Sequence, residues 1–150
     1  MKIFLLSLTL ITFSFAQKKE VSHNVFYGEL LGEIPGISIN YERETISNLN
    51  LRLGMGFLIS ESTSNSGSHT MIGGLLIGMC DYLINVSGNN YIETDAGTIT
   101  NGSYFFPAYA IGYRYYPRYG GFLFRITFNI LIYKNGHTFP FGGIGLGVAF

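Results

Sequence analysis

The 150-residue chain has little charge, a single cysteine and, beyond its first residues, no apolar run long enough for a membrane-spanning helix. Charged residues make up 12% of the sequence, about half the usual share, which is unusual for a water-soluble domain. Because Cys80 is alone, no internal disulfide is possible, and a disulfide-stapled secreted scaffold is excluded. The formal charge is balanced, so the composition implies no nucleic-acid partner.

What the chain does contain is glycine and aromatic residues, with 20 glycines and an aromatic share of 16%. No heptad or amphipathic helical period follows residue 20, whereas alternation with a period of two residues recurs. An apolar chain without helical spans can satisfy its backbone polar groups in a bilayer only as a closed barrel.

The N-terminus has the order of a secretory signal peptide. Lys2 supplies a positive charge, residues 3–15 are mainly apolar, and Ser14 and Ala16 place small residues at a cleavage site. No cysteine follows Ala16, which excludes a lipoprotein anchor there. We therefore expect a cleaved signal peptide over 1–16, a short lead over 17–23 and a barrel over 24–150; a buried first strand is the alternative reading of residues 3–15.

Apolar residues alternate with small ones most clearly at the C-terminus, where Ile144, Leu146, Val148 and Phe150 share one face. Comparable alternation marks 37–42, 51–57, 105–115 and 122–132, and weaker patterns mark 24–32, 70–83 and 90–100. An even number of strands is the rule for bacterial single-chain barrels. The prediction is an all-β fold, an eight-stranded antiparallel up-and-down transmembrane β-barrel.

Two strand registers follow from the turn signals. A turn over 117–120 places Tyr115 opposite Phe122, so that every outward residue of one strand meets an outward residue of the next. Pairing Phe124 with Phe150 keeps the same rule for the last two strands, and it sets Arg125 opposite Ala149. Small residues beside long ones suit the interior of a narrow barrel.

Loop lengths predict how the barrel is oriented. The polar segments 60–69 and 134–140 follow strands that run outward if the chain begins in the periplasm, whereas the turns near Ile46, Val86 and Pro117 are short. Short periplasmic turns and longer outer loops are typical of outer-membrane barrels. Residues 33–36 are the exception, a short outer loop.

The composition of the second face of the strands distinguishes a membrane barrel from a water-soluble one. This face consists largely of Gly, Ala, Ser and Thr, which is too bare for a solvated exterior but suits a narrow lumen. Tyr113, Tyr115, Phe122 and Phe150 would form an aromatic girdle at the periplasmic interface. The alternative is a soluble lipocalin-like carrier with its apolar face inside.

The terminal run GGIGLGVAF looks like the C-terminal strand signal by which outer-membrane barrels are recognised for assembly, carried here by Ile144, Leu146, Val148 and Phe150. The stretches IGYRYYPRYGGFLFRITF, NVFYGELLG and SINYER resemble short bacterial outer-membrane β-barrel proteins without an assigned activity. This resemblance implies an outer-membrane location and no functional residues.

The candidate site is a set of charges predicted to point into the lumen. Such charges must pair or contact water, because an isolated charge in a low dielectric is costly. One reading is a conducting or binding lumen, and the other is a structural ion-pair network that plugs a narrow barrel. The set consists of Glu42, Arg52, Glu93, Asp95, Arg114 and Arg125, with Glu29 and Asp81 as further members.

No catalytic, cofactor-binding or metal site is predicted. His23, His69 and His137 show no ligand spacing, and a hydrolase would need a histidine beside a serine nucleophile and an orienting carboxylate. We expect a structural or surface-interaction role for a small integral outer-membrane protein. The alternatives are a narrow pore or small-ligand passage and, as weaker ones, a membrane-embedded lipid hydrolase using His69 or His137, or the soluble carrier. The expected partners are outer-membrane lipid and, during biogenesis, the barrel-assembly machinery; any extracellular ligand is unknown.

A closed barrel that resists detergent should be heat-modifiable. Mature chain extracted in mild detergent should change its gel mobility on boiling and give a β-rich circular dichroism spectrum. An unchanged mobility, with the chain soluble in the periplasm without detergent, would contradict the membrane prediction.

Overall fold

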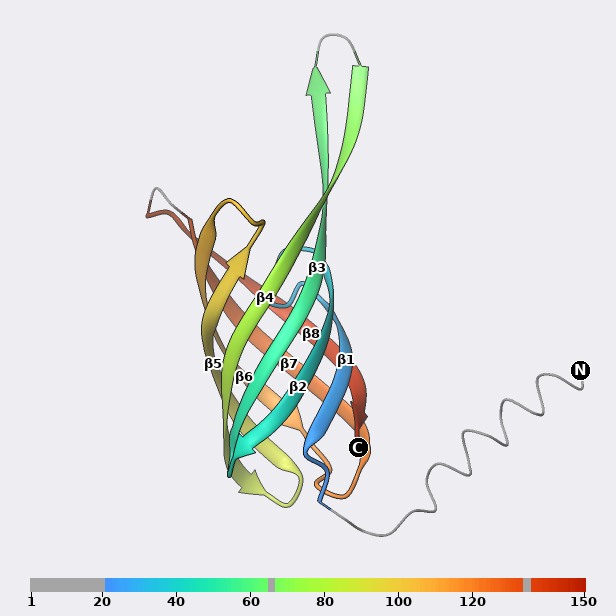
Figure 1. Ribbon diagram of the computed structural model, residues 1–150, viewed down its shortest axis with the longest axis vertical. Helices are drawn as coiled ribbons and strands as arrows, with labels where there is room; N and C mark the ends of the chain where they lie inside the picture. Colours follow the sequence, from blue (N-terminus) through green and yellow to red (C-terminus); the bar gives the residue numbers. More distant parts are fainter. Residues whose placement is uncertain (1–20, 65–66, 134–135) are drawn as a thin grey trace, which may run out of the picture.

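The computed structural model describes residues 21–64, 67–133 and 136–150, those of 59–72 as backbone only, and they form one closed antiparallel barrel (Figure 1). Each strand pairs with its neighbours in chain order, and β1 pairs with β8 to close the barrel. The eight-stranded antiparallel β-barrel predicted from the sequence is therefore confirmed. The strands are β1 (Asn24–Leu30), β2 (Ile37–Ile46), β3 (Leu49–Ser64), β4 (Gly67–Ser87), β5 (Asn90–Thr100), β6 (Phe105–Tyr115), β7 (Gly121–Ile132) and β8 (Thr138–Ala149).

The two ends of the barrel differ. The β2–β3, β4–β5 and β6–β7 turns lie at the end where β1 begins and β8 finishes, which we call the proximal end (Figure 1). Asn24 and Phe150 exchange backbone hydrogen bonds of 3.1 and 2.9 Å there, so the first and last strands are joined at their tips. The β1–β2, β3–β4, β5–β6 and β7–β8 connections lie at the opposite, distal end.

Every strand presents an apolar face outward, as the alternation predicts. Phe26 and Leu30 of β1 are exposed whereas Val25, Tyr27 and Glu29 are buried inside. No helix long and apolar enough to cross a membrane occurs within the described ranges. The four residues of the expected aromatic girdle, Tyr113, Tyr115, Phe122 and Phe150, are exposed near the proximal end.

The predicted registers are wrong by an even number of residues. Tyr115 pairs with Phe124 instead of Phe122, and Phe124 pairs with Leu146 instead of Phe150. A shift by two or four residues keeps every side chain on its face, so face periodicity cannot detect it. The observed register sets Arg125 opposite Gly145 rather than Ala149, which gives the long side chain more room.

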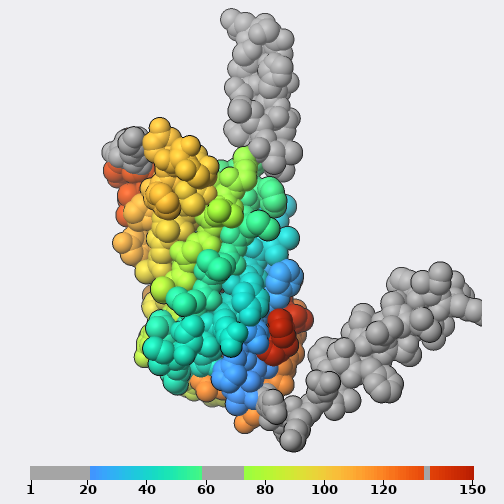
Figure 2. All heavy atoms as spheres, viewed as in Figure 1, coloured from blue at the N-terminus to red at the C-terminus, as the bar shows by residue number. Residues whose placement is uncertain are grey.

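The distal segments are more regular than expected. Residues 60–64 and 67–69 belong to β3 and β4, and β8 begins at Thr138, so neither 60–69 nor 134–140 is wholly a loop. The β3–β4 pairing runs from Leu49↔Tyr82 to Ser64↔Gly67, whereas β2 reaches β3 only as far as Phe57 and β5 reaches β4 only as far as Leu76. The two strands beyond these points form a two-stranded ribbon that projects from the barrel (Figure 1). In the space-filling view β1, β2, β3 and β4 lie side by side on one face of the barrel (Figure 2).

The β1–β2 connection, residues 31–36, folds into the lumen instead of projecting outward, and we call it the plug loop. Leu31 donates a backbone hydrogen bond of 2.8 Å to Gly36, and Leu31 has a positive φ of 53°. The side chains of Glu33 and Ile34 are buried inside the barrel. Gly143 of β8 lies against this loop, because a side chain there would meet the Leu31 carbonyl oxygen at 2.5 Å.

Residues 21–23, which precede β1, lie at the proximal end. Ser22 is buried, and its backbone N–H donates to the Arg118 carbonyl at 2.7 Å. The hydroxyl of Tyr116 donates to the Ser22 carbonyl at 2.5 Å. Burial, together with the charges of Glu44 and Glu42, raises the pKa of Tyr116 to about 12, so this hydroxyl keeps its proton in the physiological range.

The plug loop predicts different effects for two adjacent glycines. Gly143→Ala should lower the free energy of unfolding by about 1–3 kcal/mol, because the new methyl group meets the Leu31 oxygen and the Gly32 Cα at 2.7 Å. Gly142→Ala is the matched control, since its nearest neighbour would be the Thr127 carbonyl oxygen at an ordinary 3.6 Å. Urea unfolding midpoints of refolded barrels in lipid vesicles measure both, and equal midpoints would contradict this packing.

Candidate functional site: the charged lumen

A layer of ionisable side chains crosses the middle of the lumen. Seven of the eight strands and the plug loop contribute charged groups, whereas β8 contributes the glycines that leave them space. All of these charged residues are at most 3% exposed. They are Glu29 (β1), Glu33 (plug loop), Glu42 (β2), Arg52 (β3), Asp81 (β4), Glu93 and Asp95 (β5), Arg114 (β6) and Arg125 (β7).

Apolar layers cover the charged layer on both sides. Toward the proximal end lies a cluster made of Val25, Tyr27, Leu83, Tyr91, Tyr116, Leu123 and Ala149. Toward the distal end lies a second cluster, made of Ile34, Ile77, Met79, Ile99, Ala108 and Leu131, with Leu75, Phe106 and Phe141 packed against it. The order along β4 shows the sequence of layers, since Met79, Asp81 and Leu83 point inward in turn.

Arg52 joins the acids of three different segments. Its Nη1 donates to Glu33 Oε1 at 2.5 Å and to the Tyr27 hydroxyl at 2.7 Å. Its Nη2 donates to Asp81 Oδ1 at 2.7 Å and to Asp95 Oδ2 at 3.1 Å. One guanidinium group thus ties the plug loop to β1, β4 and β5.

Arg125 lies beside Arg52 and shares partners with it. Its Nη2 donates to Asp95 Oδ2 at 2.7 Å and to Glu33 Oε1 at 3.3 Å, and its Nε donates to Glu93 Oε1 at 2.9 Å. It also donates from Nη1 to the Tyr27 hydroxyl, and its guanidinium carbon lies 5.2 Å from the centre of the Tyr27 ring. The two arginines therefore hold Glu33 and Asp95 between them, which offsets their mutual repulsion.

Arg114 completes the network on the proximal side. Its Nη1 donates to Glu42 Oε1 at 2.5 Å, and its Nε lies 2.5 Å from Glu93 Oε2. Asn50 also donates from its side-chain amide to Glu42 Oε1. Glu93 therefore bridges Arg114 and Arg125, so the charged groups form one connected network.

Glu33 is the member of the network that sequence patterning missed. Burial by itself would raise the pKa of Glu33, but the charges of Arg52 and Arg125 outweigh burial and lower this pKa to about 2. Strand alternation could not place this residue, because it lies in a connection that was expected to face outward. A signal was available in Gly32 and Gly36, which let the short loop turn inward around Glu33 and Ile34.

The structure brings all six candidate lumen residues into this network, together with Glu29 and Asp81. Ile144, Leu146, Val148 and Phe150 are exposed on the outer face, and their role in assembly stays a prediction. His23 and His137 lie at opposite ends of the barrel, so they cannot share a site. The side chain of His69 and residues 1–16 fall outside the described residues.

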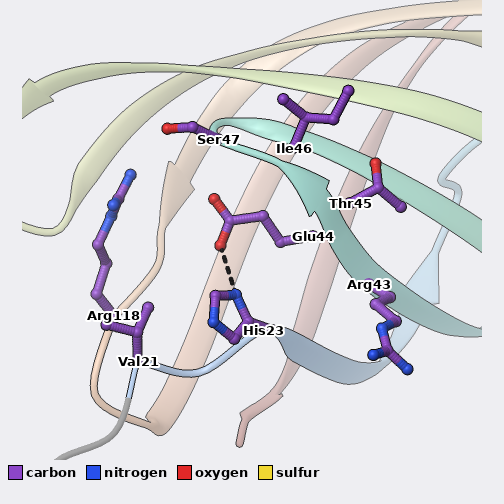
Figure 3. A pocket seen from close by; sticks show the side chains of 8 residues that line it. All are labelled: Val21, His23, Arg43, Glu44, Thr45, Ile46, Ser47 and Arg118. Carbon is purple, nitrogen blue, oxygen red and sulfur yellow. Dashed lines mark hydrogen bonds and ion pairs between the residues drawn. The ribbon is translucent and has the colours of Figure 1, made fainter.

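An open depression of about 430 Å³ lies at the proximal rim (Figure 3). The imidazole Nδ1 of His23 lies 3.1 Å from Glu44 Oε2 across it. Arg118 lines one side, and its guanidinium donates to the Tyr91 hydroxyl at 2.9 Å and to Asn48 at 2.8 Å. In this depression His23 and Glu44 are thus partnered with each other, and Arg118 is bound to Tyr91 and Asn48. The lumen is therefore the stronger candidate for a functional site.

Comparison with known proteins identifies a shared fold. No family model and no curated protein matches the sequence. Among solved structures, the chain is similar to the N-terminal β-barrel domain of Pseudomonas aeruginosa OprF, with a TM-score of 0.58. The match covers 89% of this chain and 100% of that chain at 14% sequence identity, and an identity this low shows the fold alone.

Removing the Glu33 carboxylate should weaken the folded barrel. Because Glu33 is ionised between two arginines, Glu33→Gln breaks the ion pairs that bind the plug loop to Arg52 and Arg125 and should cost about 3–5 kcal/mol. The low pKa of Glu33 means that its stabilising contribution is complete above about pH 5 and is lost as the pH falls toward 2.

Unfolding midpoints measured between pH 7 and pH 2 test this prediction. The difference between wild type and Glu33→Gln should be largest at neutral pH and should shrink as the solution is acidified. Glu44→Gln, which removes a carboxylate at the proximal rim, is the control for a general effect of lost charge. A constant difference at all pH values would show that Glu33 does not act through its charge.

Proposed function

We propose that this chain is a small integral outer-membrane β-barrel protein whose lumen is plugged and whose role is structural or lies in contacts made at its distal end. The single observation that carries this proposal is the filled lumen, in which a connected charged network lies between two apolar clusters.

The outer surface supports a membrane location. Large apolar side chains are exposed on every strand, and a water-soluble barrel would bury such a face instead. The charges point inward, which is the reverse of a lipocalin-like carrier with an apolar interior. The outward residues that carry this pattern include Phe26, Ile39, Leu53, Leu76, Ile92, Tyr109, Phe128 and Leu146.

The lumen supports a plugged barrel over a pore. Arg52 and Arg125 fill its centre, and both are bound to Glu33 of the plug loop. Ile34 of the same loop is fully buried among the distal apolar cluster. Apolar clusters fill the lumen on both sides of the charged layer. A continuous aqueous path would therefore require the plug loop and the side chains around it to move.

The distal end supports a role in contacts. The β3–β4 ribbon extends past the strands that flank it, and its backbone groups beyond Phe57 and Leu76 pair only within the ribbon. In an outer-membrane barrel with short periplasmic turns, this end faces outward. In this orientation the ribbon projects beyond the flanking strands on the outer side, where a partner can reach it.

Single-channel recording in planar bilayers tests the plugged lumen. Refolded wild-type barrel should insert without giving conductance steps, because the network and both apolar clusters block the lumen. Defined, repeated steps from the wild-type protein would overturn the plugged state and favour the alternative, a narrow pore or small-ligand passage lined by the inward charges.

A double substitution in the plug loop serves as the positive control for detecting an open lumen in these recordings. Replacing both Glu33 and Ile34 by glycine removes the charge that binds the arginines and the side chain that fills the distal cluster. This variant should give more frequent current fluctuations than wild type. Leu53→Ala, which changes only the outward face of β3, is the matched control and should stay silent.

A further inference from the structure

The charged layer of the lumen contains more acids than bases. Among the described residues it holds the six carboxyl groups of Glu29, Glu33, Glu42, Asp81, Glu93 and Asp95, against the three guanidinium groups of Arg52, Arg114 and Arg125. If every group were ionised, the layer would carry three uncompensated negative charges in a space closed by apolar side chains on both sides.

Such an excess is not tolerated in a buried layer. Taking an ionised carboxylate out of water costs several kcal/mol, and the cost is recovered only when a partner of opposite charge and further hydrogen bonds are present. A buried group without such partners takes up or loses a proton instead. The deficit of three positive charges therefore requires protons or bound cations.

Glu29 is the carboxyl group with the weakest pairing. It is 2% exposed, and neither of its carboxyl oxygens has a hydrogen-bond partner among the described residues. The nearest guanidinium nitrogens lie 3.6 Å away on Arg125 and 4.0 Å away on Arg52, whereas Glu33 lies 2.5 Å from Arg52. Glu29 thus points into the network but does not share in its short ion pairs.

Other acids leave one oxygen without a hydrogen bond. They include Asp81, whose Oδ2 lies 3.9 Å from Arg114, and Asp95 on β5. Arg125, Arg52 and Glu33 interact directly with Glu29, and the ionisable groups buried in the lumen around them come from every strand but β8. They are Tyr27 on β1, Glu33 on the plug loop, Glu42 on β2, Arg52 on β3, Asp81 on β4, Glu93 and Asp95 on β5, Arg114 on β6 and Arg125 on β7.

We propose that the lumen of this barrel is a proton-binding site that holds three protons on its six carboxyl groups at neutral pH, with one of them on Glu29. A protonated Glu29 can donate a hydrogen bond to a neighbouring acceptor such as the Glu33 carboxylate, which a second carboxylate cannot do. The three arginines occupy the centre of the layer, and no described group of carboxyls is arranged to hold a metal ion.

Proton binding couples the stability of the barrel to pH. In the unfolded chain the same carboxyls are ionised at pH 7, since free Asp and Glu lose their protons near pH 4. The folded barrel then binds more protons than the unfolded chain, so its stability falls as the pH rises through and above neutrality. This inference goes beyond the proposed function, and its test reads proton content rather than conductance.

Infrared spectroscopy of the refolded barrel at pH 7 tests the proposal directly. Protonated carboxyl groups give a carbonyl band separate from that of carboxylates, and wild type should show three equivalents of it. Glu29→Gln should fold, because the amide is close in shape to a protonated carboxyl group, and it should lose one of the three equivalents. Glu44→Gln, at the proximal rim, should leave the band unchanged.

The outcomes separate clearly. Absence of the acid band in wild type overturns the proposal, and a stoichiometric metal ion found by elemental analysis of the same sample would then identify the compensating charge. A band that is unaffected by Glu29→Gln overturns the assignment to Glu29. If Glu29→Gln does not fold, Asp81→Asn provides the second variant, and it should also reduce the band.

Alkaline unfolding supplies an independent readout. The urea midpoint of wild type in vesicles should fall between pH 7 and pH 10, and Glu29→Gln should show a smaller fall, because the variant has one proton fewer to release. A midpoint that is flat or rises over this range in wild type would overturn the proposal.

Discussion

The structure depends on the placement of three arginines that are fully buried inside the barrel. Each guanidinium group reaches carboxylates on strands that are distant in sequence, so Arg52 links β3 to the plug loop, β4 and β5. If one arginine is removed, the carboxylates that it binds lose their compensating charge, and the free-energy cost exceeds that of losing a surface ion pair. The network therefore ties the strands together from within the lumen.

The apolar clusters and the glycines serve this network. The proximal and distal clusters keep solvent from the charges, which strengthens each ion pair in the low-dielectric interior. Gly145 of β8 faces Arg125, and any side chain there would meet the Arg125 Cγ at 2.6 Å. The inward-facing glycines of β8 thus leave the space in which long side chains from the other strands meet at the centre of the lumen.

Strand alternation was sufficient for the fold class, because the side-chain period of two assigns each residue to a face without knowledge of its neighbours. That is why Arg52, Arg114 and Arg125 could be placed in the lumen from their positions between outward apolar residues. The registers of β6–β7 and β7–β8 could not be found this way, since a shift of two residues keeps all faces. The position of Glu33 in the lumen could not be predicted for a related reason, because a residue in a connection between strands has no alternation that assigns it to a face.

The sequence by itself determined that the chain forms strands with an apolar outer face and charges on the inner one, because both properties follow from local residue order. Only the tertiary structure decided which acid meets which arginine, that the loop over 31–36 turns inward, and that the acids outnumber the bases within one sealed layer. Those features depend on strand register and barrel closure, which bring Glu33, Arg52 and Arg125 within bonding distance although they are far apart along the chain.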